Sequence, residues 1–262
     1  ILRAVGGNLT GLSRTWERTT PPETTAILAH RGAWGEVAEN TLDAFESAIQ
    51  MGADMIEFDV RQTGDGRLVV HHDPSRDGMP LNAVRATALS DGRAQTPLLE
   101  EVLELARGRI GVDVELKEPG YVSEVLRLLR RNGVENALLT SFHDDVVREA
   151  KELEPTIATG LLVGRYRSAT ELFPAGRLKR ARADVLVIHH LLLNTGVLAR
   201  IEHPCLVWTV NTSARVDRLL TNPKVAGVIT DRPQAALDQR ANCARRAELS
   251  ASAASTSSRR RG

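Results

Sequence analysis

The sequence predicts a (β/α)8 TIM barrel of the α/β class, and three observations support this fold. Short β-branched runs alternate with amphipathic stretches of about 10–15 residues, which is typical of βα units around a parallel sheet. The chain has 262 residues, of which 42% are hydrophobic, so one large core is the simplest arrangement. Almost every ionisable residue within the runs lies at a carboxyl end, the rim on which barrel sites are built.

Nine runs are predicted as strands, one more than the barrel needs: 26–30, 55–60, 68–72, 110–116, 137–142, 158–163, 184–190, 205–210 and 225–230. Only RQTGDGR separates the second run from the third, which is too short for a parallel crossover, and its GDG sequence signals a turn. We therefore expect a β-hairpin extension after strand 2, with residue 59 opposite residue 71 and residue 57 opposite residue 73. The other eight runs form the barrel.

The segments between the runs have the spacing of amphipathic helices. TLDAFESAIQMG and YVSEVLRLLRRNG each place apolar residues on one helical face and end at a glycine. The residues on these faces are Leu42, Phe45, Ala48 and Ile49 in the first segment, and Val122, Val125, Leu126 and Leu129 in the second. We expect such helices to cover the outside of the strand ring.

Both ends of the chain differ from this pattern. Residues 1–25 lack hydrophobic periodicity, and the chain ends in the small, polar and basic stretch SASAASTSSRRRG. Such compositions bury too little apolar surface to fold. We expect a poorly ordered N-terminal segment (1–25), one barrel domain (26–245) and a disordered basic tail (246–262).

Charge and hydropathy exclude several kinds of partner. The 34 basic and 33 acidic residues give a formal net charge of +1, so no overall field favours nucleic acid or an anionic membrane. No apolar window approaches the roughly 20 residues of a membrane span, which argues against stable membrane insertion. We expect a cytoplasmic protein with Cys205 and Cys243 as free thiols, although the first residue is Ile, which leaves open a leader removed before it.

Three carboxylates are predicted to meet at the rim. Glu57 and Asp59 are two residues apart on one strand and therefore share a face, and Glu115 lies on the next parallel strand. Converging carboxylates repel one another unless they share protons or hold a hard cation, and oxygen ligands suit Mg²⁺ or Ca²⁺. The alternative is that one of them forms a salt bridge with Lys117 or Arg31.

Two histidines are predicted beside these carboxylates. His30 ends the first strand, and the hairpin returns His72 to the same place. Imidazole is the side chain best suited to exchange protons near neutral pH, although a single histidine at a strand end is more often structural. Arg31 offers a planar donor fork for phosphate and Lys117 a second positive charge. This set indicates phosphoryl chemistry rather than acyl transfer, because no serine or cysteine nucleophile is placed by a sharp turn.

These residues occur in motifs that resemble the glycerophosphodiester phosphodiesterase family. The motifs are HRG with ENTLDAF, GADMIEFDVRQTGDGRLVVHHD, VELK, WTVN and GVITDRP, and the resemblance spans about residues 27–233. It implies metal-dependent hydrolysis of glycerophosphodiesters to an alcohol and glycerol phosphate. It also implies a small-molecule or lipid-derived phosphodiester as the binding partner.

The resemblance assigns roles residue by residue. It implies that His30 and His72 are the acid and base pair and that Glu57, Asp59 and Glu115 bind the divalent metal. By the same resemblance Arg31 and Lys117 contact the phosphate, Glu39 lines the site and Trp208 offers an apolar wall. His71 is not expected to be the catalyst, because the working histidine of the motif directly precedes the aspartate. A glycerol hydroxyl that attacks phosphorus to give a cyclic phosphate and direct attack by water both fit these residues.

The sequence departs from the family pattern at two places. Ala38 stands where the family has proline, and only a short segment separates Asp73 from Thr96, where many members carry an inserted subdomain. A short, open loop would favour bulky or lipid-like diesters. The alternatives to this function are a lysophospholipase D or sphingomyelinase D type activity, which uses a similar core on a similar barrel, and a non-catalytic barrel that binds a phosphorylated ligand. Three further histidines are expected to be loop or hydrogen-bonding residues: His143, His189 and His190.

Overall fold

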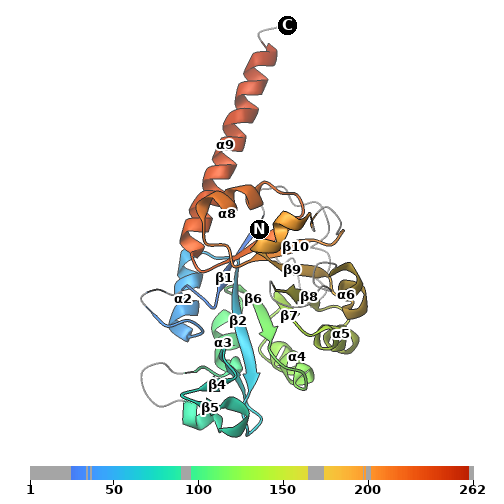
Figure 1. The fold of residues 1–262 in the computed structure, drawn as a ribbon. Helices are drawn as coiled ribbons and strands as arrows, with labels where there is room; N and C mark the ends of the chain where they lie inside the picture. Colours follow the sequence, from blue (N-terminus) through green and yellow to red (C-terminus); the bar gives the residue numbers. More distant parts are fainter. Residues whose placement is uncertain are drawn as a thin grey trace.

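A computed structural model describes residues 25–33, 35, 37–89, 96–164, 174–196, 198 and 202–259. Eight parallel strands close into a barrel, as the sequence predicts (Figure 1). They are β1 (Ala26–His30), β2 (Met55–Gln62), β6 (Gly111–Leu116), β7 (Ala137–Ser141), β8 (Ala158–Val163), β9 (Val185–His189), β10 (Cys205–Trp208) and β11 (Val225–Thr230). Pairing of β1 with both β11 and β2 closes the ring.

The ninth run is β3 (Leu68–Val70), which pairs antiparallel with β2. Val60 lies opposite Val70, and the His71 amide donates to the Asp59 carbonyl oxygen at 2.9 Å, so the predicted register is observed. The connecting turn is closed by the Thr63 amide, which donates to the Arg67 carbonyl oxygen at 2.9 Å. The strand ends two residues earlier than predicted, and His72 lies in the loop that follows it.

A small subdomain follows β3. It contains β4 (Ser75–Arg76), β5 (Met79–Pro80) and the 3-10 helices η3 (Leu81–Ala83) and η4 (Ala86–Leu89). Leu81, Ala86 and Leu89 pack with Val69 as a separate small core. Residues 90–95 lie outside the described part, and the described part of this connection contains no larger inserted subdomain.

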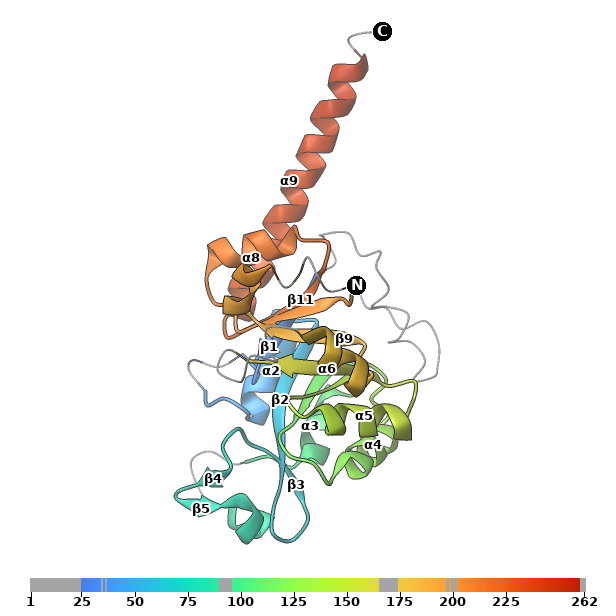
Figure 2. The same cartoon turned by 45° about the vertical axis from the view of Figure 1, so that its right-hand side comes forward.

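Helices surround the barrel (Figures 1 and 2). They are α2 (Leu42–Met51), α3 (Leu99–Ala106), α4 (Val122–Arg131), α5 (Asp144–Leu153), α6 (Pro174–Ala181), α8 (Ser213–Leu220) and α9 (Pro233–Arg259), with the 3-10 helix η6 (His190–Thr195) after β9. The predicted apolar faces of α2 and α4 are turned inward: Phe45, Ala48 and Val125 are buried. The Thr41 hydroxyl caps α2 by accepting the Ala44 amide, which explains where this helix begins.

The barrel interior has an apolar lower part and a polar rim. Leu28, Met55 and Leu206 belong to one buried cluster inside the strand ring. Successive side chains of a strand alternate between its two faces, so the residue two positions after Leu28 (His30) and the residue two positions after Met55 (Glu57) also point inward. The alternation of side chains along each strand therefore places apolar residues in the core and polar residues at the rim.

The last helix extends away from the barrel in both views (Figures 1 and 2). Arg240 anchors its first half, since its guanidinium donates to the Thr25 carbonyl oxygen and pairs with Asp54. Residues 245–250 are exposed. The tail predicted to be disordered spans residues 246–262, whereas α9 continues to Arg259; the alanines of this stretch have high helix propensity. The predicted N-terminal segment lies outside the described residues except for Thr25.

The described residues contain no helix that is long and apolar enough to cross a membrane. The cysteines are free thiols, as predicted: Cys205 is buried and Cys243 is partly buried.

Candidate active site at the carboxyl rim of the barrel

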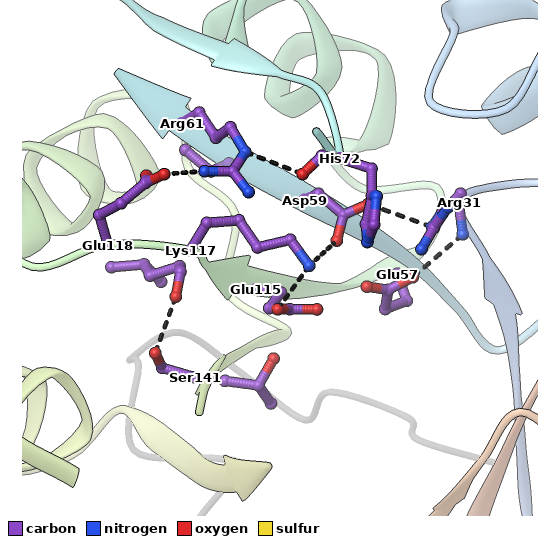
Figure 3. Close-up of polar contacts among 12 residues, drawn as sticks. Arg31, Glu57, Asp59, Arg61, His72, Glu115, Lys117, Glu118 and Ser141 are labelled. Atoms are coloured by element: carbon purple, nitrogen blue, oxygen red, sulfur yellow. Dashed lines mark hydrogen bonds and ion pairs between the residues drawn. The ribbon is translucent and has the colours of Figure 1, made fainter. Parts of the chain in front are cut away.

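Glu57, Asp59 and Glu115 converge at the rim (Figure 3). The parallel register of β2 and β6 places Asp59 beside Glu115, and Glu57 lies on the same face two residues earlier. One oxygen from each carboxylate lies within 4.8 Å of the others, and all three residues are buried. The predicted carboxylate cluster is therefore present.

Two cations contact this cluster. The Lys117 ammonium lies 2.7 Å from Asp59 Oδ1 and 2.6 Å from Glu115 Oε1 (Figure 3). The Arg31 guanidinium Nε lies 3.2 Å from Asp59 Oδ2, and the Arg31 backbone amide donates to Glu57 Oε2 at 3.0 Å. The salt bridges that the sequence analysis raised as an alternative to a metal site thus exist alongside the cluster.

The environment separates the pKa values of the three carboxyl groups. Burial and the negative charge of Asp59 raise the pKa of Glu57 well above its ordinary value. Burial also raises the pKa of Glu115, to about 7, against the opposing effect of Lys117. For Asp59 burial acts in the same upward direction, but the charges of Lys117 and Arg31 outweigh it and lower its pKa.

These properties fit a hard divalent cation. Among the described residues, only His30 lies within ion-pair distance of the Glu57 carboxylate, with Nε2 3.9 Å from Oε2. Burial raises the pKa values of Glu57 and Glu115, and within the described part of the chain only two cationic side chains, Lys117 and Arg31, contact the three carboxyl groups. Three buried oxygen donors without enough positive charge are the donor set that Mg²⁺ or Ca²⁺ prefers.

The two predicted histidines face the same cavity. His30 ends β1, and its Nδ1 lies 2.6 Å from Asp231 Oδ1. His72 is placed by the loop after β3: its Nδ1 lies 2.8 Å from Asp73 Oδ1, and its backbone carbonyl accepts a hydrogen bond from Arg61 Nε at 2.8 Å. Burial lowers the pKa of His72, which favours the neutral imidazole.

The cavity holds about 180 Å³ and has a charged and an apolar side. The polar lining residues are His30, Arg31, Glu57, His72, Asp113, Glu115, Lys117 and Thr140, and the apolar ones are Phe142, Leu162, Trp208 and Ile229. The Phe142 and Trp208 rings meet edge to face, with centroids 5.7 Å apart. Trp208 thus lies on the wall where the resemblance places it.

Glu39 lies beside this cavity rather than on its wall. Its carboxylate Oε1 accepts a hydrogen bond from Arg31 Nη1 at 2.7 Å, and its side chain is 38% exposed. Since Arg31 lines the cavity, Glu39 reaches the site through Arg31. That Glu39 lines the substrate site stays a prediction of the resemblance.

Asp113 is a further acidic residue of this group that was not predicted, and it lies opposite Glu57 in the register of β2 and β6. It is buried, Thr140 Oγ1 donates to its Oδ1 at 2.8 Å, and no described residue hydrogen-bonds its Oδ2. Burial raises the pKa of Asp113 to about 8. The signal was present in GVDVEL, because a residue two positions before Glu115 on a strand shares its face.

Asn40 and Arg61 were also missed. Asn40 Nδ2 donates to Asp59 Oδ2 at 2.8 Å, so the asparagine of the ENT motif orients a carboxylate of the cluster. Arg61 pairs with Glu118 in addition to its bond to His72, and thereby ties the loop after β3 to the loop after β6 (Figure 3). Neither arrangement follows from strand alternation alone.

The other histidines lie outside the cavity lining. His143 precedes α5, and its amide donates to the Ser141 hydroxyl. His189 and His190 stack on each other with ring centroids 4.5 Å apart, and His189 also meets the edge of Trp208. The His71 amide bonds to the carbonyl oxygen of Asp59. His143 lies between β7 and α5, and His189 Nδ1 accepts a hydrogen bond from the Leu191 amide, as expected of loop and hydrogen-bonding residues.

Comparison with known proteins gives one consistent family. The model of the glycerophosphoryl diester phosphodiesterase family matches residues 30–235. A glycerophosphodiester phosphodiesterase of Bacillus altitudinis is 31% identical over 245 residues, which cover 81% of this chain and 97% of that protein.

Two solved structures share the fold. A glycerophosphodiester phosphodiesterase of Parabacteroides distasonis superposes with a TM-score of 0.74 at 25% identity, over 84% of this chain and 98% of the other. A phosphodiesterase of Oleispira antarctica, solved in complex with the product sn-glycerol-3-phosphate, superposes with a TM-score of 0.72 at 25% identity, over 82% and 96% of the two chains.

Proposed function

The chain belongs to the glycerophosphoryl diester phosphodiesterase family, and from this premise we propose that it hydrolyses glycerophosphodiesters to an alcohol and glycerol phosphate. One observation carries the proposal: His30 and His72 line the same cavity as Glu57, Glu115, Arg31 and Lys117, and Asp59 lies next to this lining in the carboxylate cluster. Phosphodiester hydrolysis requires groups that exchange protons, cations that bind the phosphate and oxygen ligands for a metal ion. The two histidines, the two cationic side chains and the carboxylates supply them at one site. The product bound to the Oleispira antarctica relative supports the same class of substrate.

A divalent ion, Mg²⁺ or Ca²⁺, would be held by Glu57, Asp59 and Glu115. When bound, such an ion neutralises part of the negative charge that develops on phosphate oxygens. The ion would also allow all three buried carboxyl groups to ionise, whereas the protein alone keeps the pKa values of two of them high.

The cationic side chains bind and orient the diester. Arg31 and Lys117 both line the cavity, and their present partners are the carboxylates of the cluster and Glu39. A phosphate that binds between Arg31 and Lys117 takes the place of the carboxylates as the anionic acceptor of their charge-assisted hydrogen bonds. Glu39 keeps the Arg31 fork in place during this exchange.

His30 and His72 move the protons. One imidazole accepts the proton of the attacking hydroxyl, and the other donates a proton to the oxygen of the leaving alcohol. The attacking group is either the neighbouring glycerol hydroxyl, which gains from proximity and gives a cyclic phosphate, or water. Rapid quench of a turnover followed by phosphorus NMR distinguishes the two, because only the first route accumulates a cyclic species when His72 is replaced by alanine.

The alcohol group faces a mixed wall. Phe142, Leu162 and Trp208 offer apolar surface next to the charged side, and the described part of the connection after His72 is short. This arrangement accommodates a small alcohol and also leaves room for a lipid-like one. A lysophospholipase D type activity is therefore the outcome to be separated from glycerophosphodiester hydrolysis.

A substrate panel tests the proposal. Purified protein is incubated with glycerophosphocholine, glycerophosphoethanolamine and lysophosphatidylcholine, and released choline or ethanolamine and glycerol phosphate are quantified. We expect release of glycerol phosphate from the first two, and a loss on the order of 10³-fold in His30→Ala and Glu57→Ala. His143→Gln is the matched control, because this histidine lies outside the lining. Faster turnover of lysophosphatidylcholine would favour the alternative, and no turnover of any diester would contradict the proposal.

A further inference from the structure

His30 is held by Asp231, which is in turn held by Asn211, and both residues follow the ends of neighbouring strands. Asp231 directly follows β11, which pairs with β1, and its Oδ1 lies 2.6 Å from His30 Nδ1. Asn211 follows β10 and donates from Nδ2 to Asp231 Oδ2 at 2.5 Å. The sequence places Asn211 and Asp231 at strand ends but gives them no partner, because they lie about 180 and 200 residues from His30 along the chain.

The orientation of the Asn211 amide is fixed by the backbone. Its Oδ1 accepts hydrogen bonds from the Asp231 amide at 3.0 Å and from the Thr230 hydroxyl at 3.2 Å. An oxygen must face these donors, so the NH₂ group must face the carboxylate. Asn211 therefore offers the Asp231 carboxylate a donor and never an acceptor.

The donor pattern also fixes the proton on His30. The Asn211 NH₂ group donates to Asp231 Oδ2, as it would to a carboxylate, and although burial raises the pKa of Asp231, its hydrogen bonds with His30 and Asn211 and the nearby positive charge lower it overall. An ionised carboxylate only accepts hydrogen bonds, so the short contact places a hydrogen on His30 Nδ1. The other ring nitrogen, Nε2, then points toward Glu57 and the cavity.

We propose that Asp231, clamped by Asn211, is the positioning residue of His30: it holds the imidazole in the Nδ1–H tautomer and directs Nε2 to the carboxylate cluster. The proposal rests on the proposed function for its effect on turnover. The tautomer of His30 is independent of the proposed function, because it is a property of the protein without substrate.

The pair formed by His72 and Asp73 offers a matched comparison. Its Nδ1 to Oδ1 distance is 2.8 Å, but the two side chains are 40% and 68% exposed, against 16% and 23% for His30 and Asp231. Water competes for an exposed hydrogen bond and screens its charge, so the outer pair contributes less to orientation. We expect the two histidines to depend unequally on their aspartates.

The test replaces each aspartate by asparagine. In Asp231→Asn the new amide oxygen faces the Asn211 donor, so its NH₂ group faces His30 Nδ1 and forces the ring proton onto Nε2. We expect kcat to fall on the order of 10³-fold, with KM within about threefold because Asp231 and Asn211 lie outside the cavity lining. Asp73→Asn should lower kcat by no more than about tenfold.

Long-range ¹H–¹⁵N NMR of histidine-labelled protein reads the tautomer directly. The expected result is an Nδ1–H form of His30 in the unmodified protein and an Nε2–H form in Asp231→Asn. An unchanged tautomer, or a kcat within threefold of the unmodified protein, would overturn the proposal. A fall in kcat with an unchanged tautomer would also overturn it, since Asp231 would then act only through stability.

A second variant covers the case in which Asp231→Asn does not fold. Asn211→Ala leaves the carboxylate in place but removes its clamp, so we expect the Nδ1–H tautomer with kcat lowered by about tenfold. An unchanged kcat in this variant would contradict the proposed role of Asn211 in holding Asp231. If the protein hydrolyses no diester, the proposed function fails, and the tautomer in Asp231→Asn still decides the role of Asp231.

Discussion

Asp113 shows how a single buried carboxyl group ties stability to pH. Its pKa is about 8 in the folded protein, and that of an unfolded aspartate is about 3.9. Below pH 4 both states bind the proton. Between pH 4 and 8 only the unfolded chain releases it, so the folded state loses stability as the pH rises.

We therefore expect Asp113→Asn to stabilise the metal-free protein increasingly from pH 4 to pH 8, by up to about 4 kcal/mol at pH 7. Asparagine keeps an oxygen for the Thr140 hydroxyl and carries no charge. Urea unfolding in the presence of chelator at several pH values measures the difference. A constant difference across this range would show that Asp113 is ionised in the fold.

Lys117 stabilises the carboxylate cluster in the absence of metal. Its ammonium contacts Asp59 and Glu115, and removal of one partner from a buried ion pair typically costs about 3 kcal/mol. We expect Lys117→Met to unfold at lower urea concentration in chelator and to recover stability when Mg²⁺ or Ca²⁺ is added, because the ion then supplies the missing positive charge.

Lys151→Met is the control for this experiment. Lys151 pairs with Asp184 at 2.7 Å, away from the rim, so its variant should lose stability without recovery by either cation. Equal recovery in both variants, or none in Lys117→Met, would argue against a cation site at the cluster.

Individual residues could be predicted from the sequence where strand alternation determines their position. Glu57, Asp59 and Glu115 share one face because of their spacing, and their convergence was predicted for that reason. Asp113 obeys the same rule and was overlooked. The bond between His30 and Asp231 could not be predicted, because it joins residues 201 positions apart and depends on how β11 closes against β1.

Among the elements, the turn after β1 is the most constrained. Gly32 has a φ of +88°, and a Cβ atom there would lie 2.7 Å from the backbone carbon of Ala44 in α2. The preceding residue, Arg31, has a φ of +56° and donates its amide to Glu57. The HRG sequence therefore combines a left-handed turn with a close approach of α2, which positions Arg31.

We expect Gly32→Ala to destabilise the protein by about 3 kcal/mol, from backbone strain together with overpacking against α2. Gly66→Ala is the control, because Gly66 also has a positive φ of +79° but nothing within 4 Å of the added methyl group. It should cost about 1 kcal/mol. Thermal unfolding of both variants measures the contrast, and equal losses would mean that contact with α2 contributes nothing.

The elements of the barrel were predicted well because each is defined by local periodicity and bounded by turns. The antiparallel pairing of β2 and β3 followed from a seven-residue connection that no parallel crossover could span. The end of β3 at Val70 could not be predicted, because it depends on the small subdomain that follows. The continuation of α9 beyond residue 245 was not predicted, because the polar composition was weighed above the high helix propensity of alanine.

At the scale of the whole molecule, α9 divides into an anchored and a projecting half. Arg240 joins the helix to Asp54 and Thr25 at the base of the barrel, whereas residues 245–250 are exposed. We expect removal of residues 247–262 to change the melting temperature by no more than about 2 °C. Removal from Arg240 onward should destabilise the protein by about 2 kcal/mol, because Asp54 loses its charged partner and keeps only the Ile27 amide among the described residues. Calorimetry of both truncations tests this, and equal melting temperatures would contradict the anchor.

The barrel brings three carboxylates, two cations and two imidazoles together around one cavity, from β1, β2, β6 and the loops that follow β1, β3 and β6. The central claim is that this convergence makes diester hydrolysis depend on a divalent ion bound at the carboxylates. The most direct measurement is a calorimetric titration of chelated protein with Mg²⁺ or Ca²⁺, with glycerophosphocholine turnover followed on the same samples. We predict that turnover rises in proportion to occupancy of one ion site and that Glu57→Ala abolishes both signals. Full turnover in chelated protein would contradict the account.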